Sequence, residues 1–197
     1  LAPAGATPTL DELPRRLADF ATIGEALDFA AGGQRGLNFH DARGTLTRAY
    51  RYSELRKDAL ALAHRFVAIG IKPSDRVALV AETGAEFAAA FFGAVYAGAW
   101  PVPLPLPTSF GGREAYVEQL GIQLKSCDPA LFLYPPELTD FCEAAAVQAG
   151  FTARSWDTLA AVEPAEGGLP SPSADDIAYL QYSSGSTRFP HGVAVTH

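Results

Sequence analysis

Residues 76–81, Arg-Val-Ala-Leu-Val-Ala, form a continuous apolar run that is typical of a strand covered on both faces. Thr83 is expected to cap the helix that follows, which would end near Ala97. Further along, short apolar runs alternate with helical segments, at 111–127 (helix), 130–134 (strand), 137–149 (helix) and 151–156 (strand). Such alternation indicates parallel βαβ units. The sequence therefore predicts a three-layer α/β fold with a mostly parallel sheet.

The first part of the chain is predicted to hold a helix, a hairpin and a longer helix. Thr22 and Glu25 satisfy a capping box for a short helix that ends at Gly32-Gly33. Residues 37–41 and 45–52 alternate apolar with polar side chains, which is typical of a β-hairpin. Ser53 is expected to cap the longer helix, whose apolar face carries Leu55, Ala59, Leu62, Phe66 and Ile69.

The segment 99–107 is rich in proline, which cannot donate to a β-ladder, so we expect at most a short strand that leads into an extended loop. A polyproline-type ligand segment is disfavoured because the apolar residues between the prolines require burial. The apolar stretch 87–100 is shorter than the about 20 residues of a membrane span, so it predicts a core helix and no span. Asp157 is expected to cap a short turn before the Pro/Gly/Ser-rich loop 163–174.

Composition restricts the class of protein. With 197 residues, 48% hydrophobic and 19% charged, the chain can bury a core. The net charge of −7 argues against nucleic acid as a partner, because a phosphate backbone requires a basic surface. Residues 1–21 read as a loose lead-in without a signal-peptide pattern. Cys127 and Cys142 read as buried thiols in a reducing compartment, so a cytoplasmic location is expected.

The segment 177–195 is where composition implies chemistry. Two strand-like runs, 177–182 and 193–195, flank a loop that contains Ser183, Ser184, Gly185, Ser186 and Thr187. Small residues let backbone N–H groups turn toward an anion, and the hydroxyl groups add donors to phosphate oxygens. Arg188 adds a fixed positive charge. We therefore predict a phosphate-binding loop, placed beyond the carboxyl end of a buried strand of the sheet.

Other interpretations of this loop were weighed. It lacks the Gly-x-x-x-x-Gly-Lys-Ser/Thr pattern of a Walker A loop, and it is not a Rossmann fingerprint. A polar surface linker is disfavoured because apolar strands flank both sides. Arg188 and His191 can also be solvated loop residues, and His197 is interpreted as a packed histidine. Asp175 and Asp176 are interpreted as the polar start of a strand rather than as metal ligands, because adjacent carboxylates point to opposite faces.

The pattern Ser-Ser-Gly-Ser-Thr-x-x-Pro-x-Gly-Val at 183–193 resembles the nucleotide-phosphate loop of the adenylate-forming superfamily of acyl-CoA synthetases, peptide-synthetase adenylation domains and luciferases. Arg188 stands where most members have Gly, and His191 where most have Lys. The Ser-Thr-Arg-x-Pro-x-Gly variant is similar to the fatty acyl-AMP ligases, in which the Lys position varies. Residues 98–107 and 110–116 also look like a segment of that family, and the resemblance covers residues 20–197.

This resemblance implies a ligase that uses ATP and Mg²⁺ to activate a fatty acid as its adenylate and passes the acyl group to an acyl carrier protein. It implies phosphate-binding roles for Ser183, Ser184, Gly185, Ser186, Thr187, Arg188, His191 and Gly192. The family's adenine-binding motif, magnesium-binding Glu, ribose-binding Asp and catalytic Lys lie downstream of this loop, beyond His197. Residues 22–197 are therefore expected to be the N-terminal portion of the adenylation domain, and to be inactive alone.

Two further functions stay open. The chain could belong to an acyl-CoA synthetase of the same superfamily, or to a non-catalytic module that keeps only phosphate or nucleotide affinity. A downstream reading frame with the Glu, Asp and Lys motifs would favour an enzyme. A natural stop codon after His197 would favour the module.

Overall fold

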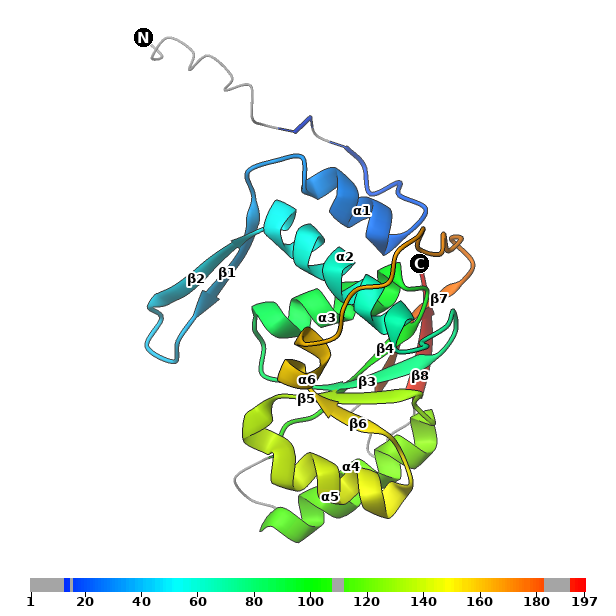
Figure 1. Ribbon diagram of the computed structural model, residues 1–197. Coiled ribbons are helices and arrows are strands. Elements are labelled where there is room, and N and C mark those ends of the chain that lie inside the picture. The colour runs from blue at the N-terminus through cyan, green and yellow to red at the C-terminus, as the bar shows by residue number, and fades with distance from the viewer. Residues whose placement is uncertain (1–12, 15, 108–111, 183–191) are drawn as a thin grey trace.

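The computed structural model describes residues 13–14, 16–107, 112–182 and 192–197. Its centre is a sheet covered by α2 (Tyr52–Ala68) and α3 (Ala85–Tyr96) on one face, and by α4 (Gly112–Cys127) and α5 (Thr139–Ala149) on the other (Figure 1). This arrangement confirms the predicted three-layer α/β architecture.

The central sheet is parallel, as predicted. β3 (Arg76–Val80) lies between β4 (Trp100–Leu104) and β5 (Leu131–Tyr134), and β6 (Ala153–Ser155) pairs with the outer side of β5, in the order β4-β3-β5-β6. Every residue of β5 is buried, and so is every residue of β3 after Arg76. Helices on both faces explain why these strands are continuously apolar in sequence.

Alternate residues of β3 serve the two helical layers. Val77 and Leu79 belong to the core cluster that contains Phe66 of α2 and Ala90 of α3. Ala78 and Val80 belong to the cluster built from α4 and α5, whose members include Tyr116, Leu120, Leu124 and Cys142. Successive side chains of a strand point to opposite faces, so one short run supplies both cores. The short helix α6 (Trp156–Ala160) adds Leu159 to the first cluster.

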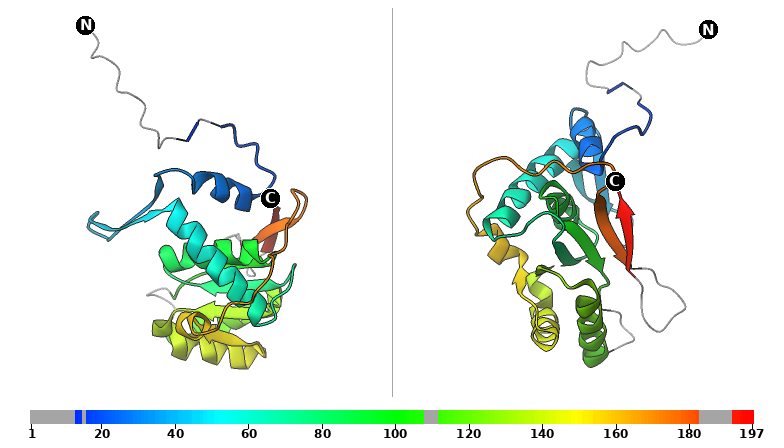
Figure 2. Two further views of the ribbon diagram at one scale, coloured as in Figure 1. Left: turned by 45° about the horizontal axis from the view of Figure 1, so that its top comes forward. Right: turned by 90° about the vertical axis from the view of Figure 1, so that its right-hand side faces the viewer.

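The N-terminal elements agree with the sequence. α1 (Ile23–Ala30) is capped by Thr22, whose Oγ1 accepts a hydrogen bond from the Glu25 N–H at 3.1 Å. β1 (Gly36–His40) and β2 (Leu46–Arg51) form the antiparallel hairpin, which extends to one side of the helices (Figure 2). A third core cluster joins α1, the hairpin, α2 and α3 through Leu27, Tyr50, Leu55, Ala85 and Ala89.

Two predicted helix caps are wrong. α2 begins at Tyr52 because β2 leads into it directly, and its N-cap is Arg51 rather than Ser53. There the Glu54 carboxylate accepts a hydrogen bond from the Arg51 N–H at 2.9 Å. α3 is preceded by Gly84 rather than Thr83, and no side chain caps it.

The segment after β5 also differs from its prediction. The expected helix over 137–149 starts with a 3₁₀ turn, η1 (Pro136–Leu138), and α5 begins only at Thr139. Asp157 does not cap the next helix. Ser155 does, because its hydroxyl accepts a hydrogen bond from the Thr158 N–H.

A two-stranded ribbon, β7 (Ile177–Tyr182) and β8 (Gly192–Thr196), lies beside β4 (Figure 2). The two strands pair antiparallel, so the expectation that the loop follows a strand of the parallel sheet is wrong. Ala178 is the one residue of β7 that is buried, so this strand is not the buried strand that its apolar sequence predicts.

Proline explains why the described part of β4 forms no ladder with the ribbon. The Trp100 N–H donates to the Asp75 carbonyl at 2.7 Å, toward the β3 side. Alternation along the strand turns the nitrogens of Pro101 and Pro103 to the opposite edge. Because proline has no N–H, that edge of β4 lacks those donors.

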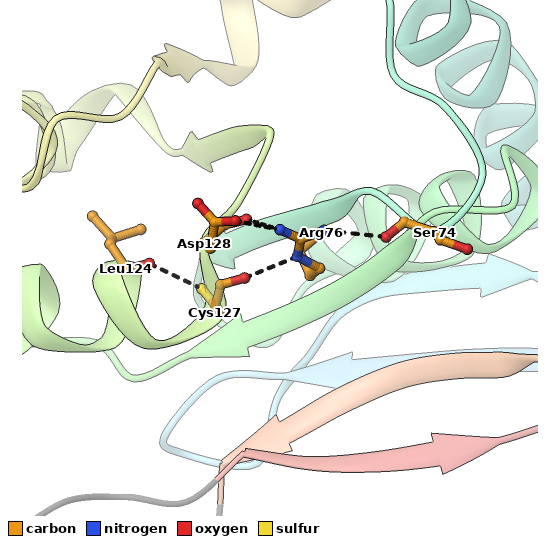
Figure 3. Close-up of polar contacts among 5 residues, drawn as sticks. All are labelled: Ser74, Arg76, Leu124, Cys127 and Asp128. Atoms are coloured by element: carbon orange, nitrogen blue, oxygen red, sulfur yellow. Dashed lines mark hydrogen bonds and ion pairs between the residues drawn. The ribbon is translucent and has the colours of Figure 1, made fainter.

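Arg76 joins the start of β3 to the end of α4 (Figure 3). Its Nε donates to the Cys127 carbonyl at 3.0 Å, and its Nη2 lies 2.7 Å from the Asp128 carboxylate and also bonds the Asp128 carbonyl. A guanidinium suits this position because the last carbonyls of a helix have no intrahelical donors. The contact lies at the amino ends of the parallel strands, opposite the edge where ligands of such sheets bind, so we interpret it as a structural contact.

Candidate functional site

The predicted phosphate-binding residues Ser183, Ser184, Gly185, Ser186, Thr187, Arg188 and His191 lie outside the described residues, so their roles stay predictions. The residues that flank them are described. Tyr182 ends β7, Gly192 begins β8, and the two are paired across the ribbon. The ribbon therefore holds the two ends of segment 183–191 side by side, in agreement with the predicted order of strand, loop and strand.

Tyr182 connects the end of the ribbon next to segment 183–191 to α4. Its hydroxyl donates to the backbone carbonyl of Gln123 at 3.4 Å, and its side chain packs against the core cluster that includes Leu120 and Leu124. A Cβ placed on Gly192 would lie 3.5 Å from the Tyr182 ring, which is ordinary van der Waals contact. Burial raises the pKa of the Tyr182 hydroxyl, which stays a hydrogen-bond donor at neutral pH.

Gln123 itself carries a polar atom without a partner. Its side chain is 3% exposed, and its Oε1 makes no hydrogen bond within the part of the chain that the structure describes. A buried amide oxygen without a donor is uncommon in folded proteins. It marks the region of α4 next to Tyr182 as polar inside an apolar core.

A separate cleft of about 830 Å³ opens where the parallel strands end. Its walls are the residues that follow each strand: Ala81, Glu82 and Thr83 after β3, Leu106 and Pro107 after β4, Pro135, Pro136 and Glu137 after β5, and Trp156 and Asp157 after β6. Ligands of open α/β sheets bind at this edge. The exposed carboxylates of Glu82, Glu86, Glu137 and Asp157 disfavour an anion there, and no described residue of β7 or β8 contributes to the lining.

The sequence reasoning did not identify this cleft. Only part of the signal was present: Glu82 and Pro135 directly follow predicted strands of a parallel sheet, whereas the order of the strands in the sheet was not predictable from the sequence. The prediction instead assigned the carboxyl-end position to the serine-rich loop, which joins the two strands of the ribbon.

His197 and Asp176 support the ribbon at its other end. His197 is half-buried, and its Nδ1 accepts a hydrogen bond from the Ile23 N–H at 3.2 Å, as expected of a packed histidine. Burial lowers the pKa of His197. The Asp176 carboxylate accepts from the Ser173 N–H at 2.7 Å, which lowers its pKa and fits the predicted polar start of a strand.

The two cysteines are buried free thiols, as predicted. Burial raises the pKa of both Cys127 and Cys142 to about 12, so neither thiol is ionised near neutral pH. They do not act as nucleophiles in this state.

We tested whether the described side chains could hold Mg²⁺. Over residues 13–14, 16–107, 112–182 and 192–197, no three His, Cys, Asp or Glu side chains are grouped closely enough to bind a metal ion. The same ranges contain no helix with the length and apolarity needed to cross a membrane.

Comparison with known proteins identifies the family. The family model described as AMP-binding enzyme matches residues 37–197, and the chain belongs to this family. It is the family of adenylate-forming enzymes, and the fold corresponds to the N-terminal domain of those enzymes.

Curated relatives include ligases that act on fatty acids. A protein from Caulobacter vibrioides named "Putative acyl-CoA synthetase" is 45% identical over 97% of this chain and 33% of its own length. The long-chain-fatty-acid–AMP ligase FadD32 of Mycolicibacterium smegmatis is 33% identical over 83% of this chain and 26% of its own length. The chain thus spans a third or less of the length of these relatives.

Solved structures of adenylate-forming proteins also match this chain. A structure from a study of fatty acyl-adenylate ligases of E. coli and L. pneumophila superposes with a TM-score of 0.87 and 42% identity, over 93% of this chain and 33% of that one. The McyG A-PCP structure, in complex with phenylalanyl-adenylate, superposes with a TM-score of 0.78 and 29% identity, over 94% of this chain and 30% of that one.

Proposed function

We propose that this chain is the N-terminal part of a fatty acyl-AMP ligase, which activates a fatty acid with ATP and delivers it to an acyl carrier protein. The observation that carries the proposal is the TM-score of 0.87, at 42% identity, to a structure from the study of fatty acyl-adenylate ligases. The Ser-Thr-Arg variant at 186–188 supports the same branch over the acyl-CoA synthetases.

Within this proposal the chain contributes the residues that bind the phosphates of ATP. Ser183, Ser184, Ser186 and Thr187 supply hydroxyl donors, and Arg188 supplies a cation. Gly185 and Gly192 have no side chain and so let the backbone approach the phosphates closely, and His191 adds a further donor. When bound, ATP would supply the α-phosphorus that the fatty acid carboxylate attacks, with pyrophosphate as the leaving group, and Mg²⁺ would offset phosphate charge.

The other groups that the reaction needs are proposed to lie outside these 197 residues. No residue of this chain is proposed to be catalytic. The coverage of 33% and 26% of two curated relatives is consistent with a larger enzyme in which later segments bind adenine, ribose and magnesium.

An acyl-CoA synthetase is the second candidate, because the relative at 45% identity carries that name. The two functions share the adenylation step and differ in the acceptor. The acceptor therefore decides between them.

The test uses the protein encoded by the complete reading frame, incubated with ATP, Mg²⁺ and a series of saturated fatty acids. Mass spectrometry should detect acyl-adenylate, followed by acyl transfer to a carrier protein that bears phosphopantetheine, and little acyl-CoA when CoA is offered instead. Rapid acyl-CoA formation would replace the proposal by the second candidate. A carrier protein without its phosphopantetheine arm is the matched control.

A further inference from the structure

The position of the ribbon relative to the rest of the fold depends on side chains. The described part of β4 forms no ladder with β7, since the edge that it turns away from β3 carries the nitrogens of Pro101 and Pro103. Because no backbone hydrogen bonds of a ladder fix the position of β7 along β4, side-chain contacts must fix it.

Two tyrosines of β7 make such contacts on opposite sides. Tyr179 and Tyr182 are three positions apart, so they point to opposite faces of the strand. The Tyr179 ring lies 5.5 Å from the ring of Phe91 in α3, at an interplanar angle of 60°. The Tyr182 hydroxyl donates to the Gln123 carbonyl of α4 at 3.4 Å. Tyr179 thus contacts the layer that contains α3, and Tyr182 contacts the layer that contains α4.

Of these two contacts, the one made by Tyr182 lies at the end of β7 where the loop starts. Tyr182 pairs with Gly192, so its position sets both ends of segment 183–191. A Cβ on Gly192 would meet the Tyr182 ring at 3.5 Å, so the ring also backs the first residue of β8.

We infer that Tyr182 is a positioning residue, whose hydroxyl bond to α4 aligns the base of the phosphate-binding loop for ATP. This inference rests on the proposed function, because it takes segment 183–191 as the loop that binds ATP phosphates. The directional part of the anchor is the hydroxyl group, since a phenyl ring alone would keep the packing but could slide along α4.

The variant that tests this is Tyr182→Phe in the full-length protein. Loss of one hydrogen bond that aligns the loop should raise the KM for ATP by about 2- to 10-fold. The expected effect is on the binding of ATP, so the kcat and the KM for the fatty acid should stay unchanged. The unfolding midpoint should change little.

Tyr116→Phe is the matched control. Tyr116 packs in the same core cluster, is 5% exposed, and donates its hydroxyl to the Pro105 carbonyl at 3.0 Å rather than to α4. It loses a hydroxyl bond that is shorter than that of Tyr182, so any general loss of stability should be at least as large in Tyr116→Phe. Only Tyr182→Phe should change the KM for ATP.

The outcomes separate this inference from the proposed function. Equal KM values for ATP in the two variants, or a fall in kcat at unchanged KM, would overturn the positioning role. If the wild-type protein forms no acyl-adenylate, the proposed function fails, and ATP affinity measured by calorimetry on the same three proteins still decides the role of Tyr182. Weaker ATP binding by Tyr182→Phe alone would then support the anchor, and equal binding would refute it.

Discussion

Arg188 is one of the two residues at which this loop departs from the common pattern of its superfamily, because a permanent cation replaces glycine directly after Thr187. A guanidinium can bond phosphate oxygens in bidentate fashion. It can equally be a solvated surface charge, since arginines in loops are mostly exposed. The two accounts predict different kinetics.

In the full-length protein, Arg188→Ala should lower kcat/KM for ATP by about ten- to a hundredfold, which corresponds to about 1.5–3 kcal/mol for a charged hydrogen bond. The KM for the fatty acid should change little. Arg188→Gly, the common residue of the superfamily, should lose as much as Ala if the guanidinium binds phosphate. Steady-state adenylation at varied ATP is the measurement, and wild-type kinetics in both variants would leave Arg188 as a solvated charge.

At the scale of elements, α2 and α3 approach each other closely at Gly93. A Cβ on Gly93 would lie 2.9 Å from the Leu62 Cβ and 3.1 Å from the Ala59 carbonyl oxygen. Neither atom is the free end of a flexible side chain, so the helices would have to separate. The absence of a side chain at Gly93 therefore sets the distance between these helices.

Gly93→Ala should be less stable than Gly121→Ala by about 1–3 kcal/mol, the usual cost of overpacking a core. Gly121 lies in α4, and a Cβ there would meet nothing within 4 Å. Both substitutions gain the same helix propensity, about 1 kcal/mol, so the difference between them isolates the steric term. Thermal unfolding of the two variants measures it, and equal midpoints would show that α2 and α3 can separate without cost.

The elements also show which parts of the fold the sequence could predict. The continuous apolar runs of β3 and β5 and the helical spacing of α2 predicted the correct elements. Burial on two faces leaves a continuous apolar run, and burial on one face of a helix leaves a periodic one. Helix starts were less predictable. Arg51 and Gly84 precede helices without a side-chain cap of their own, so the nearby Ser53 and Thr83 looked like better candidates.

The ribbon and the cleft required the structure. The apolar run 177–182 looks the same in sequence whether its partner is a parallel strand or β8, because pairing depends on residues far along the chain. Likewise Glu82, Glu137 and Asp157 are ordinary surface carboxylates until the sheet order brings their strands side by side. The serine-rich loop was identifiable because its composition, rather than its partners, carries the signal.

At the scale of the whole molecule, we propose that the 197 residues hold only the phosphate-binding part of the adenylation site. It should therefore show no fatty-acid-dependent exchange of pyrophosphate into ATP when purified alone, because the proposed groups for adenine, ribose and magnesium are elsewhere. Circular dichroism would establish that the isolated chain is folded. Exchange by the folded chain above a no-protein control would mean that these residues hold a complete site.

The central claim is that the complete protein adenylates fatty acids, and pyrophosphate exchange tests it most directly because it reports the adenylation step without any acceptor. With the full-length protein, ATP and Mg²⁺, labelled pyrophosphate should enter ATP when a fatty acid is present. Omission of the fatty acid, or its replacement by amino acids, should abolish exchange. An exchange rate that does not depend on the fatty acid, or that only an amino acid supports, would contradict the claim.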